Sequence, residues 1–167
     1  MKPIFQFALT DKLIETCRLK DRDPGEWLPV KANDSDTGWD VRAAESIFTT
    51  NGIYAKIPLG FRIFSPPGWW LKLVPRSSTF IKKYIHALYG TIDESFEGEA
   101  AFCCQFISPT IWRPGDGIQI VFGDRIGQLI PVRREEMIIK NISNEEFDKL
   151  CTERNAGRGA GGFGSTG

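Results

Sequence analysis

At 167 residues, 41% hydrophobic and 25% charged, the chain has the length and composition of one globular domain with a sizeable buried core. Its 21 basic and 21 acidic residues cancel, which argues against a general electrostatic attraction to nucleic acid or to membrane surfaces. A phosphate-binding site stays open, because a few well-placed arginines are enough to make one.

The cysteines exclude a further class. The four cysteines form no C-x-x-C pair and only one histidine accompanies them, so a zinc site with Cys and His ligands is not expected. Cys103 and Cys104 are neighbours in an apolar run, where a strand points them to opposite faces, and we interpret them as buried free thiols. The N-terminal apolar stretch is too short for a signal peptide, and no run is long enough to span a membrane. These features predict a reducing, cytoplasmic setting.

The middle of the chain predicts strands. Short runs rich in β-branched and aromatic residues are separated by proline and glycine, as at Pro58 and at residues 65–68. The predicted strands cover residues 53–58, 60–64, 69–74, 100–107, 118–122 and 125–132. Such close spacing is typical of an all-β sandwich or barrel.

Helix is predicted in only two short places. Ser143, followed three residues later by Glu146, has the capping-box pattern that opens a helix, here over residues 143–150. A second short helix is expected after Ser78, through residues 79–84.

The composition changes near Asn155, where a glycine-rich tail begins. We therefore predict a single β domain over residues 1–156 and a mobile C-terminal arm over residues 157–167.

Five segments carry side chains suited to binding and hydrolysing a nucleotide. In chain order they are T-G-W-D-V-R-A-A-E (37–45), V-P-R-S-S-T (74–79), G-T-I-D-E-S-F-E-G-E (90–99), G-D-R-I-G-Q-L-I (123–130) and R-G-A-G-G-F-G-S-T-G (158–167). Each alone has an ordinary structural interpretation, such as a glycine turn, a strand end, a solvated hairpin-like face or a flexible terminus.

Their combination favours a ligand with a phosphate chain. Arg76 and Arg158 provide planar, permanently charged forks that match phosphate oxygens. Further hydroxyl donors come from Ser77, Ser165 and Thr166. Asp93 is suited to deprotonating a water beside a phosphorus atom, and Phe163 to stacking on a base.

All five segments, in this order and with compatible spacing, resemble the five motifs of the trimeric dUTPases (deoxyuridine 5'-triphosphate nucleotidohydrolases). The resemblance covers about residues 34–167, and residues 1–33 lie outside it as a divergent N-terminal part. It implies a jelly-roll-like β-fold and a homotrimer whose active sites are each assembled from three subunits. It also implies Mg²⁺-dependent hydrolysis of dUTP to dUMP and pyrophosphate, which limits uracil incorporation into DNA and supplies dUMP for thymidylate synthesis.

The resemblance also assigns roles by position. Asp93 is the general base for the attacking water, and Asp40 contacts the magnesium through its water shell with support from Arg125. The uracil and deoxyribose are assigned to Gly90, Phe96 and Phe163. The phosphate chain is assigned to Arg76, Ser77, Gln128, Arg158, Ser165 and Thr166.

Four positions depart from the family's pattern, and one of them is Trp39, which replaces a smaller aromatic residue in the first motif. Phe96 stands where tyrosine is usual, which keeps a ring beneath the deoxyribose without its hydroxyl, and we expect sugar discrimination to survive. Ser78 replaces a glycine in the second motif, and Tyr89 is bulkier than the small residue common before Gly90.

Two other functions fit part of the pattern. The related dCTP deaminases, including bifunctional forms, share the fold, but their catalytic glutamate has its place at Cys103 here. A non-catalytic regulatory protein on the same scaffold predicts loss of the base or the tail, yet Asp93, Arg76 and the fifth motif are all present. We therefore interpret the chain as a dUTP-hydrolysing enzyme with no nucleic-acid or membrane partner.

Overall fold

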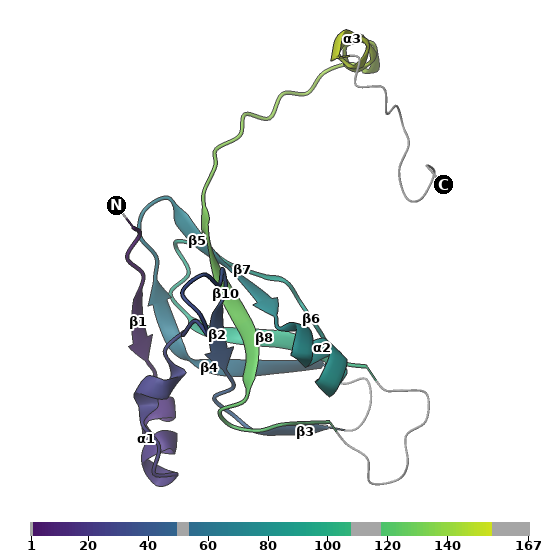
Figure 1. Ribbon diagram of the computed structural model, residues 1–167. Helices are drawn as coiled ribbons and strands as arrows, with labels where there is room; N and C mark the ends of the chain where they lie inside the picture. The colour runs from purple at the N-terminus through teal and green to yellow at the C-terminus, as the bar shows by residue number, and fades with distance from the viewer. Residues whose placement is uncertain (1, 50–53, 108–117, 155–167) are drawn as a thin grey trace. The chain divides into compact units, whose positions relative to one another are not determined.

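The structure is a computed structural model that describes residues 2–49, 54–107 and 118–154. Those residues form two antiparallel four-stranded sheets, a two-stranded ribbon and a few short helices (Figure 1). The chain divides into one unit at Met1–Glu135, which holds every described strand, and a second at Glu136–Gly167, which holds α3 (Asn144–Arg154).

Both sheets contribute to one buried cluster between them. The first sheet is ordered β1 (Gln6–Leu9), β4 (Tyr54–Phe64), β8 (Glu99–Phe106) and β6 (Ile85–Ala87). The second is ordered β2 (Trp39–Arg42), β10 (Arg125–Arg133), β5 (Trp69–Pro75) and β7 (Gly90–Ile92). The ribbon pairs β3 (Ile47–Thr49) with β9 (Ile118–Ile120). Ile57 and Phe102 from the first sheet pack with Leu71 and Ile126 from the second, which makes a jelly-roll sandwich and confirms the predicted fold class.

The strand β4 shows why these residues adopt extended structure. Its side chains alternate, with Ala55, Ile57 and Leu59 buried against the core while Tyr54 and Lys56 face outward. Full burial of a side chain such as Ile57 contributes about 1.5–3 kcal/mol, so the alternating pattern fixes which face of the strand points inward.

The break that Pro58 predicted inside this strand does not occur. Instead, the register with β8 shifts between Pro58 and Arg62, and Gly60 in that interval has φ +78°. The backbone N–H of Gly60 donates to Oε1 of Glu99 (3.1 Å), which replaces a ladder hydrogen bond at the shift. A β-bulge, which tolerates proline and a positive φ, therefore takes the place of the expected turn.

Residues 90–99, expected to be hairpin-like, cross from one sheet to the other. The strand β7 pairs with β5, whereas β8 pairs with β4 and β6. The crossing is favoured because Ile92 and Ala100, on either side of the turn, both reach the same buried cluster from opposite sheets. Within the turn, the N–H of Phe96 donates to the carbonyl oxygen of Asp93 (3.1 Å).

The N-terminal part contains a helix that the sequence pattern did not predict, α1 (Asp11–Leu19). It begins after Thr10, whose hydroxyl accepts the N–H of Leu13 (3.3 Å), and it buries Leu13 and Cys17 on one face. The cap and the apolar residues one turn apart are the signals that predict such a helix.

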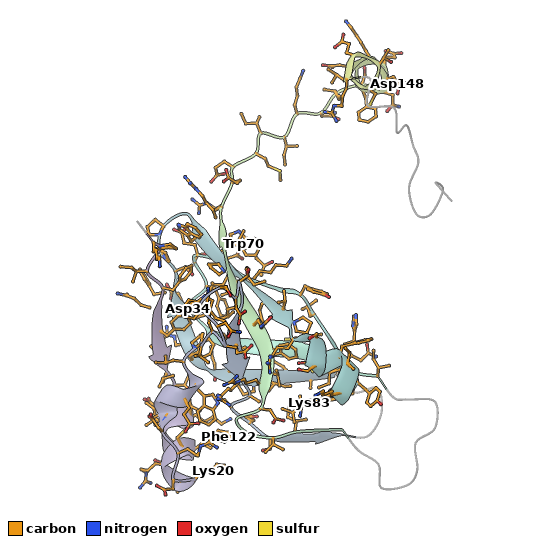
Figure 2. All side chains as sticks on the ribbon, in the orientation of Figure 1. Lys20, Asp34, Trp70, Lys83, Phe122 and Asp148 are labelled. Atoms are coloured by element: carbon orange, nitrogen blue, oxygen red, sulfur yellow. The ribbon has the colours of Figure 1, made fainter. Side chains whose placement is uncertain are left out.

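A second small core lies beneath α1. Leu13 and Cys17 pack there with Trp27 of the short 3-10 helix η1 (Pro24–Trp27) and with Phe122. Lys20, at the end of α1, places its Nζ 5.6 Å from the centre of the Phe122 ring (Figure 2). This core joins the N-terminal part to the loop that precedes β10.

The two predicted helices are confirmed. The first is α2 (Ser77–Lys83), and the second is α3, whose cap is formed by Ser143 accepting the N–H of Glu146 (3.1 Å). The helix α3 continues to Arg154, four residues beyond its predicted end.

The cysteine pair alternates across β8 as predicted. Cys104 faces the core, where burial raises the pKa of its thiol to about 12. Cys103 is only partly buried because it lies on the outward face, so the prediction of a buried thiol holds for Cys104 alone of the pair. Among the described residues, no helix is both long and apolar enough to cross a membrane.

Candidate active site

A buried carboxylate, Asp40, lies at the centre of a cluster of cationic and amide side chains. It is only 3% exposed. Its Oδ1 lies 3.1 Å from Nε of Arg76 and accepts Nε2 of Gln128 at 3.1 Å. Its Oδ2 accepts Nη1 of Arg125 at 3.4 Å. Arg125 thus contacts Asp40, and these contacts together hold the carboxylate in one orientation.

Strand pairing explains how this cluster forms. Gln128 on β10 lies directly opposite Asp40 on β2, and on the other side Asp40 exchanges backbone hydrogen bonds with Val30. Arg76 immediately precedes α2, where buried Thr79 donates its hydroxyl to the carbonyl oxygen of Ile126 (2.8 Å). That bond ties α2 to β10 and so holds Arg76 against Asp40.

A depression of about 380 Å³ opens beside the cluster. Its lining includes Thr37, Gly38, Asp40, Arg76 and Gln128. Gly38 has no room for a side chain, because a Cβ there would lie 2.9 Å from Cδ of Gln128. The glycine of the first motif thus keeps Gln128 in place, and we call this hollow the charged depression.

A second depression, of about 330 Å³, lies at the sheet-crossing segment. Its lining includes Leu73, Tyr89, Gly90, Ile92 and Phe96, so it is mainly apolar, and we call it the apolar depression. The Phe96 ring packs against Gly98, where an added Cβ would meet the ring at 2.8 Å. The absence of a side chain at Gly98 therefore lets the ring lie close to the turn, with 43% of Phe96 exposed.

The structure gathers some of the predicted site residues and separates others. Asp40, Arg76 and Gln128 line the charged depression, while Gly90 and Phe96 line the apolar one, and the two depressions share no lining residue. Ser77 is exposed at the start of α2, and Asp93 is exposed just after β7. The predicted residues of the arm, which are Arg158, Phe163, Ser165 and Thr166, lie outside the described residues.

One residue that contacts the turn before β10, Arg42, was not predicted. Arg42 donates through Nη1 to the carbonyl oxygen of Gly123 (2.7 Å) and through Nε to that of Glu26 (3.1 Å). Burial, followed by the charge of Arg125, lowers the pKa of the Arg42 guanidinium. Arg42 lies two residues after Asp40, and alternation along a strand places both side chains on the same face. This spacing is the signal that predicts that Arg42 lies near Asp40.

The two depressions differ in what they attract. The lining of the charged depression carries Arg76 together with the carboxylates of Asp36 and Asp40, and a second arginine, Arg125, contacts Asp40 without lining the depression. In the apolar depression, the Phe96 ring suits contact with the flat face of a small ring system. The backbone at Gly90 suits hydrogen bonds to the polar edge of that ring system. Among the described residues, no three His, Cys, Asp or Glu side chains form a group that could hold a metal ion.

The fold and the site together define a jelly-roll protein with one charged depression and one mainly apolar depression. The chain belongs to the dUTPase family, whose model matches residues 27–167. The deoxyuridine 5'-triphosphate nucleotidohydrolase of Hahella chejuensis is 35% identical over 146 residues, which cover 84% of this chain and 86% of the relative. That of Bartonella bacilliformis is 34% identical over 155 residues, covering 86% of this chain and 84% of the relative.

Solved structures show the same fold. A mutant dUTPase of Staphylococcus bacteriophage 80alpha with dUpNHpp is similar at a TM-score of 0.73 and 20% identity, covering 98% of each chain. A mutant dUTPase of phage phi11 of S. aureus, which reveals the coordination of a structural Mg(II) ion, is similar at a TM-score of 0.66 and 19% identity, covering 84% of this chain and 97% of that one. The family that the five motifs predicted is confirmed by the family model and by the two relatives above.

Proposed function

We propose that the protein is a dUTP diphosphatase that hydrolyses dUTP to dUMP and pyrophosphate by attack of water on the α-phosphate. This activity limits uracil incorporation into DNA and supplies dUMP for thymidylate synthesis. The observation that carries the proposal is that Asp40, Arg76 and Gln128, far apart in the chain, meet around one charged depression in a member of the dUTPase family.

The phosphate chain is assigned to the charged depression. Arg76 offers a permanent cation and Gln128 an amide, and Ser77 follows Arg76 as a hydroxyl donor. In the C-terminal arm, Arg158, Ser165 and Thr166 complete the phosphate contacts in this proposal.

The nucleoside is assigned to the apolar depression. Backbone groups around Gly90 read the edge of the uracil, and Phe96 lies beneath the deoxyribose. Phe163 of the arm stacks on the uracil, a contact of about 1–3 kcal/mol for an aromatic ring on a base.

The complete enzyme in this proposal is a homotrimer with shared sites. Support comes from the separate linings of the two depressions, since a nucleotide that uses both needs residues that one subunit does not present in a single hollow. Residues 1–156 form the body of each subunit and residues 157–167 the mobile arm that closes on a site. A cytoplasmic location belongs to the same proposal and rests on the four cysteines, which are all free.

Mg²⁺ is the proposed cofactor. Both oxygens of Asp40 are already engaged by side chains, so this carboxylate suits contact with the ion's water shell rather than direct ligation. Mg²⁺ commonly keeps several waters and is held by one or two carboxylates together with substrate phosphates, a requirement that the residues present fit. When bound, the ion neutralises negative charge on the phosphates.

In the proposed mechanism, Asp93 takes a proton from a water whose oxygen attacks the α-phosphorus. The bond from that phosphorus to the bridging oxygen breaks, and its electron pair leaves with pyrophosphate. Asp93 is exposed at the end of β7, where an approaching substrate can reach it, and a positioned base contributes about 10²–10⁴-fold to the rate. Arg76, oriented by Asp40, stabilises the charge that moves toward the leaving group.

The decisive test is pyrophosphate release from dUTP, UTP, dTTP and dCTP, each with and without Mg²⁺. We expect clear preference for dUTP and dependence on the ion. Equal rates on all four nucleotides contradict the proposal, and ammonia release from dCTP indicates a deaminase, which the cysteine at position 103 argues against.

A further inference from the structure

The N-terminal part of the chain, which lies outside the five motifs, contacts the turn that leads into β10. This turn covers residues 121–124 and is closed by the N–H of Asp124, which donates to the carbonyl oxygen of Val121 (2.9 Å). Trp27, the last residue of η1, is fully buried and packs with Phe122 of the turn. We call residues 11–27, which comprise α1 and η1, the N-terminal brace.

Trp27 contacts the turn in two ways. Its Nε1 donates to the carbonyl oxygen of Ala43 (3.1 Å), and the same oxygen accepts the N–H of Gly123 (2.8 Å). Its ring packs on the ring of Phe122, with the ring centres 4.3 Å apart. The indole also lies against Gly123, since a Cβ at that glycine would lie 3.7 Å from Cζ2 of Trp27. Two successive residues of the turn are therefore held by one buried side chain.

Arg42 ties the brace to the same turn. Its guanidinium donates through Nε to the carbonyl oxygen of Glu26 in η1 (3.1 Å) and through Nη1 to that of Gly123 (2.7 Å). A planar guanidinium holds its donors in a fixed geometry, so this side chain sets the spacing between η1 and the turn.

The turn in turn sets the place of Arg125, the residue that follows it. The Nη1 of Arg125 lies 3.4 Å from Oδ2 of Asp40, which is already long for a hydrogen bond. Ala43, three residues after Asp40, donates its N–H to the carbonyl oxygen of Asp124 (2.9 Å). A displacement of the turn therefore changes the distance between Arg125 and Asp40, the carboxylate that also holds Arg76.

We propose that Trp27 is a positioning residue that holds Arg125 beside Asp40, and thereby fixes the orientation of Arg76 during dUTP hydrolysis. The inference rests on the proposed function. Trp27 is not among the described residues that line the charged or the apolar depression, so it acts on the rate rather than on substrate binding. A displacement far from the reacting atoms can slow an enzyme by up to about 100-fold.

The test compares steady-state kinetics on dUTP and thermal unfolding of three variants of the full chain. Trp27→Phe keeps an aromatic ring on Phe122 and removes the Nε1 donor, while Phe122→Leu removes the ring on the side of the turn. The matched control is Leu13→Ala, because Leu13 belongs to the same small core but lies on α1 against Gly60.

All three variants are expected to lower Tm, because each removes contacts from the same core. We expect kcat to fall about tenfold in Trp27→Phe and in Phe122→Leu with KM unchanged, and both constants to stay at wild-type values in Leu13→Ala. Wild-type kcat in the two variants at the turn, or an equal loss of kcat in Leu13→Ala, overturns the proposal.

Hydrogen–deuterium exchange supplies a measurement that does not depend on turnover. The N–H of Gly123, which is bonded to the carbonyl oxygen of Ala43, is expected to exchange about tenfold faster in Trp27→Phe than in the wild type and in Leu13→Ala. Equal exchange in all three proteins shows that Trp27 does not hold the turn and overturns the proposal. Absence of dUTP turnover in the wild type contradicts the proposed function, while the exchange rates still report whether Trp27 holds the turn.

Discussion

The change Asp40→Asn isolates the charge at the centre of the candidate site. Asparagine has nearly the same shape, so packing around the 3% exposed side chain is preserved. It keeps one carbonyl oxygen but replaces the other acceptor with an NH₂ group, which faces a guanidinium that also only donates. One of the contacts to Arg76 and Arg125 is therefore lost, and the other becomes a hydrogen bond from a charged guanidinium to an uncharged amide oxygen.

The cost can be worked from these contacts. A hydrogen bond with a charged partner contributes about 1.5–3 kcal/mol, so the contact that is lost costs about that much. The Arg76 and Arg125 side chains are 30% and 38% exposed, so water screens part of this interaction. We expect unfolding free energy to fall by about 2 kcal/mol, which lowers Tm by about 4–8 °C for a chain of this length.

Catalysis is expected to suffer in kcat rather than in KM. An unanchored Arg76 still attracts phosphate oxygens but no longer holds the orientation that stabilises the leaving group, so we expect kcat to fall about 100-fold. Asp40→Asn removes a negative charge beside the phosphates, which favours binding, and also weakens the contact with the ion's water shell, which opposes it, so we expect KM to stay within a few-fold.

The assay combines thermal unfolding with pyrophosphate release from dUTP, and the control is Asp148→Asn on α3, an exposed acid in the second unit (Figure 2). We expect the control to match the wild type in both measurements. An Asp40→Asn protein with wild-type Tm and kcat refutes the argument that this carboxylate organises the site.

Three further predictions concern the base, the arm and the thiols. Asp93→Asn is expected to abolish dUTP turnover while preserving dUTP binding measured by calorimetry, and retained activity rejects Asp93 as the base. Deleting residues 157–167 is expected to leave a folded trimer by light scattering with severely reduced turnover; unchanged kinetics show that the arm is dispensable. Burial raises the pKa of Cys104 from its ordinary value near 9.0 to about 12, so at pH 8 we expect a maleimide to label exposed Cys151 readily and Cys104 only after unfolding. The pKa of Cys104 is higher in the folded than in the unfolded protein, so the buried thiol's contribution to the free energy of unfolding is complete below about pH 9 and is lost as the pH rises toward 12. If the unfolding free energy of Cys104→Ala declines equally over this range, Cys104 is not the group responsible.

Local pattern was enough to predict the fold class and much of the site chemistry. Closely spaced runs rich in β-branched and aromatic residues, separated by proline and glycine, predicted an all-β sandwich or barrel. The cap at Ser143 predicted α3 because the hydrogen bond between Ser143 and Glu146 joins residues only three apart in the sequence and needs no tertiary contact. The five motifs likewise identified the family from residue types and order alone.

The pairing of distant strands was not contained in any local pattern. Pro58 lacks an N–H, which locally signals a break, but the bulge at Gly60 and the carboxylate of Glu99 absorb the irregularity and let the strand continue. The motif at residues 90–99 looked like a hairpin because only the core, shared by both sheets, decides that its two strands separate.

By itself, then, the sequence determined the fold class of this protein, which residues are suited to bind phosphate and which family they resemble. Only the tertiary structure decided that Arg76, Arg125 and Gln128 contact Asp40. It also decided that Arg42 donates a hydrogen bond to the turn at Gly123, and that the predicted site residues lie in two separate depressions. The physical reason is that side-chain chemistry and periodicity act over a few residues, whereas these distances depend on strand register across the whole sandwich.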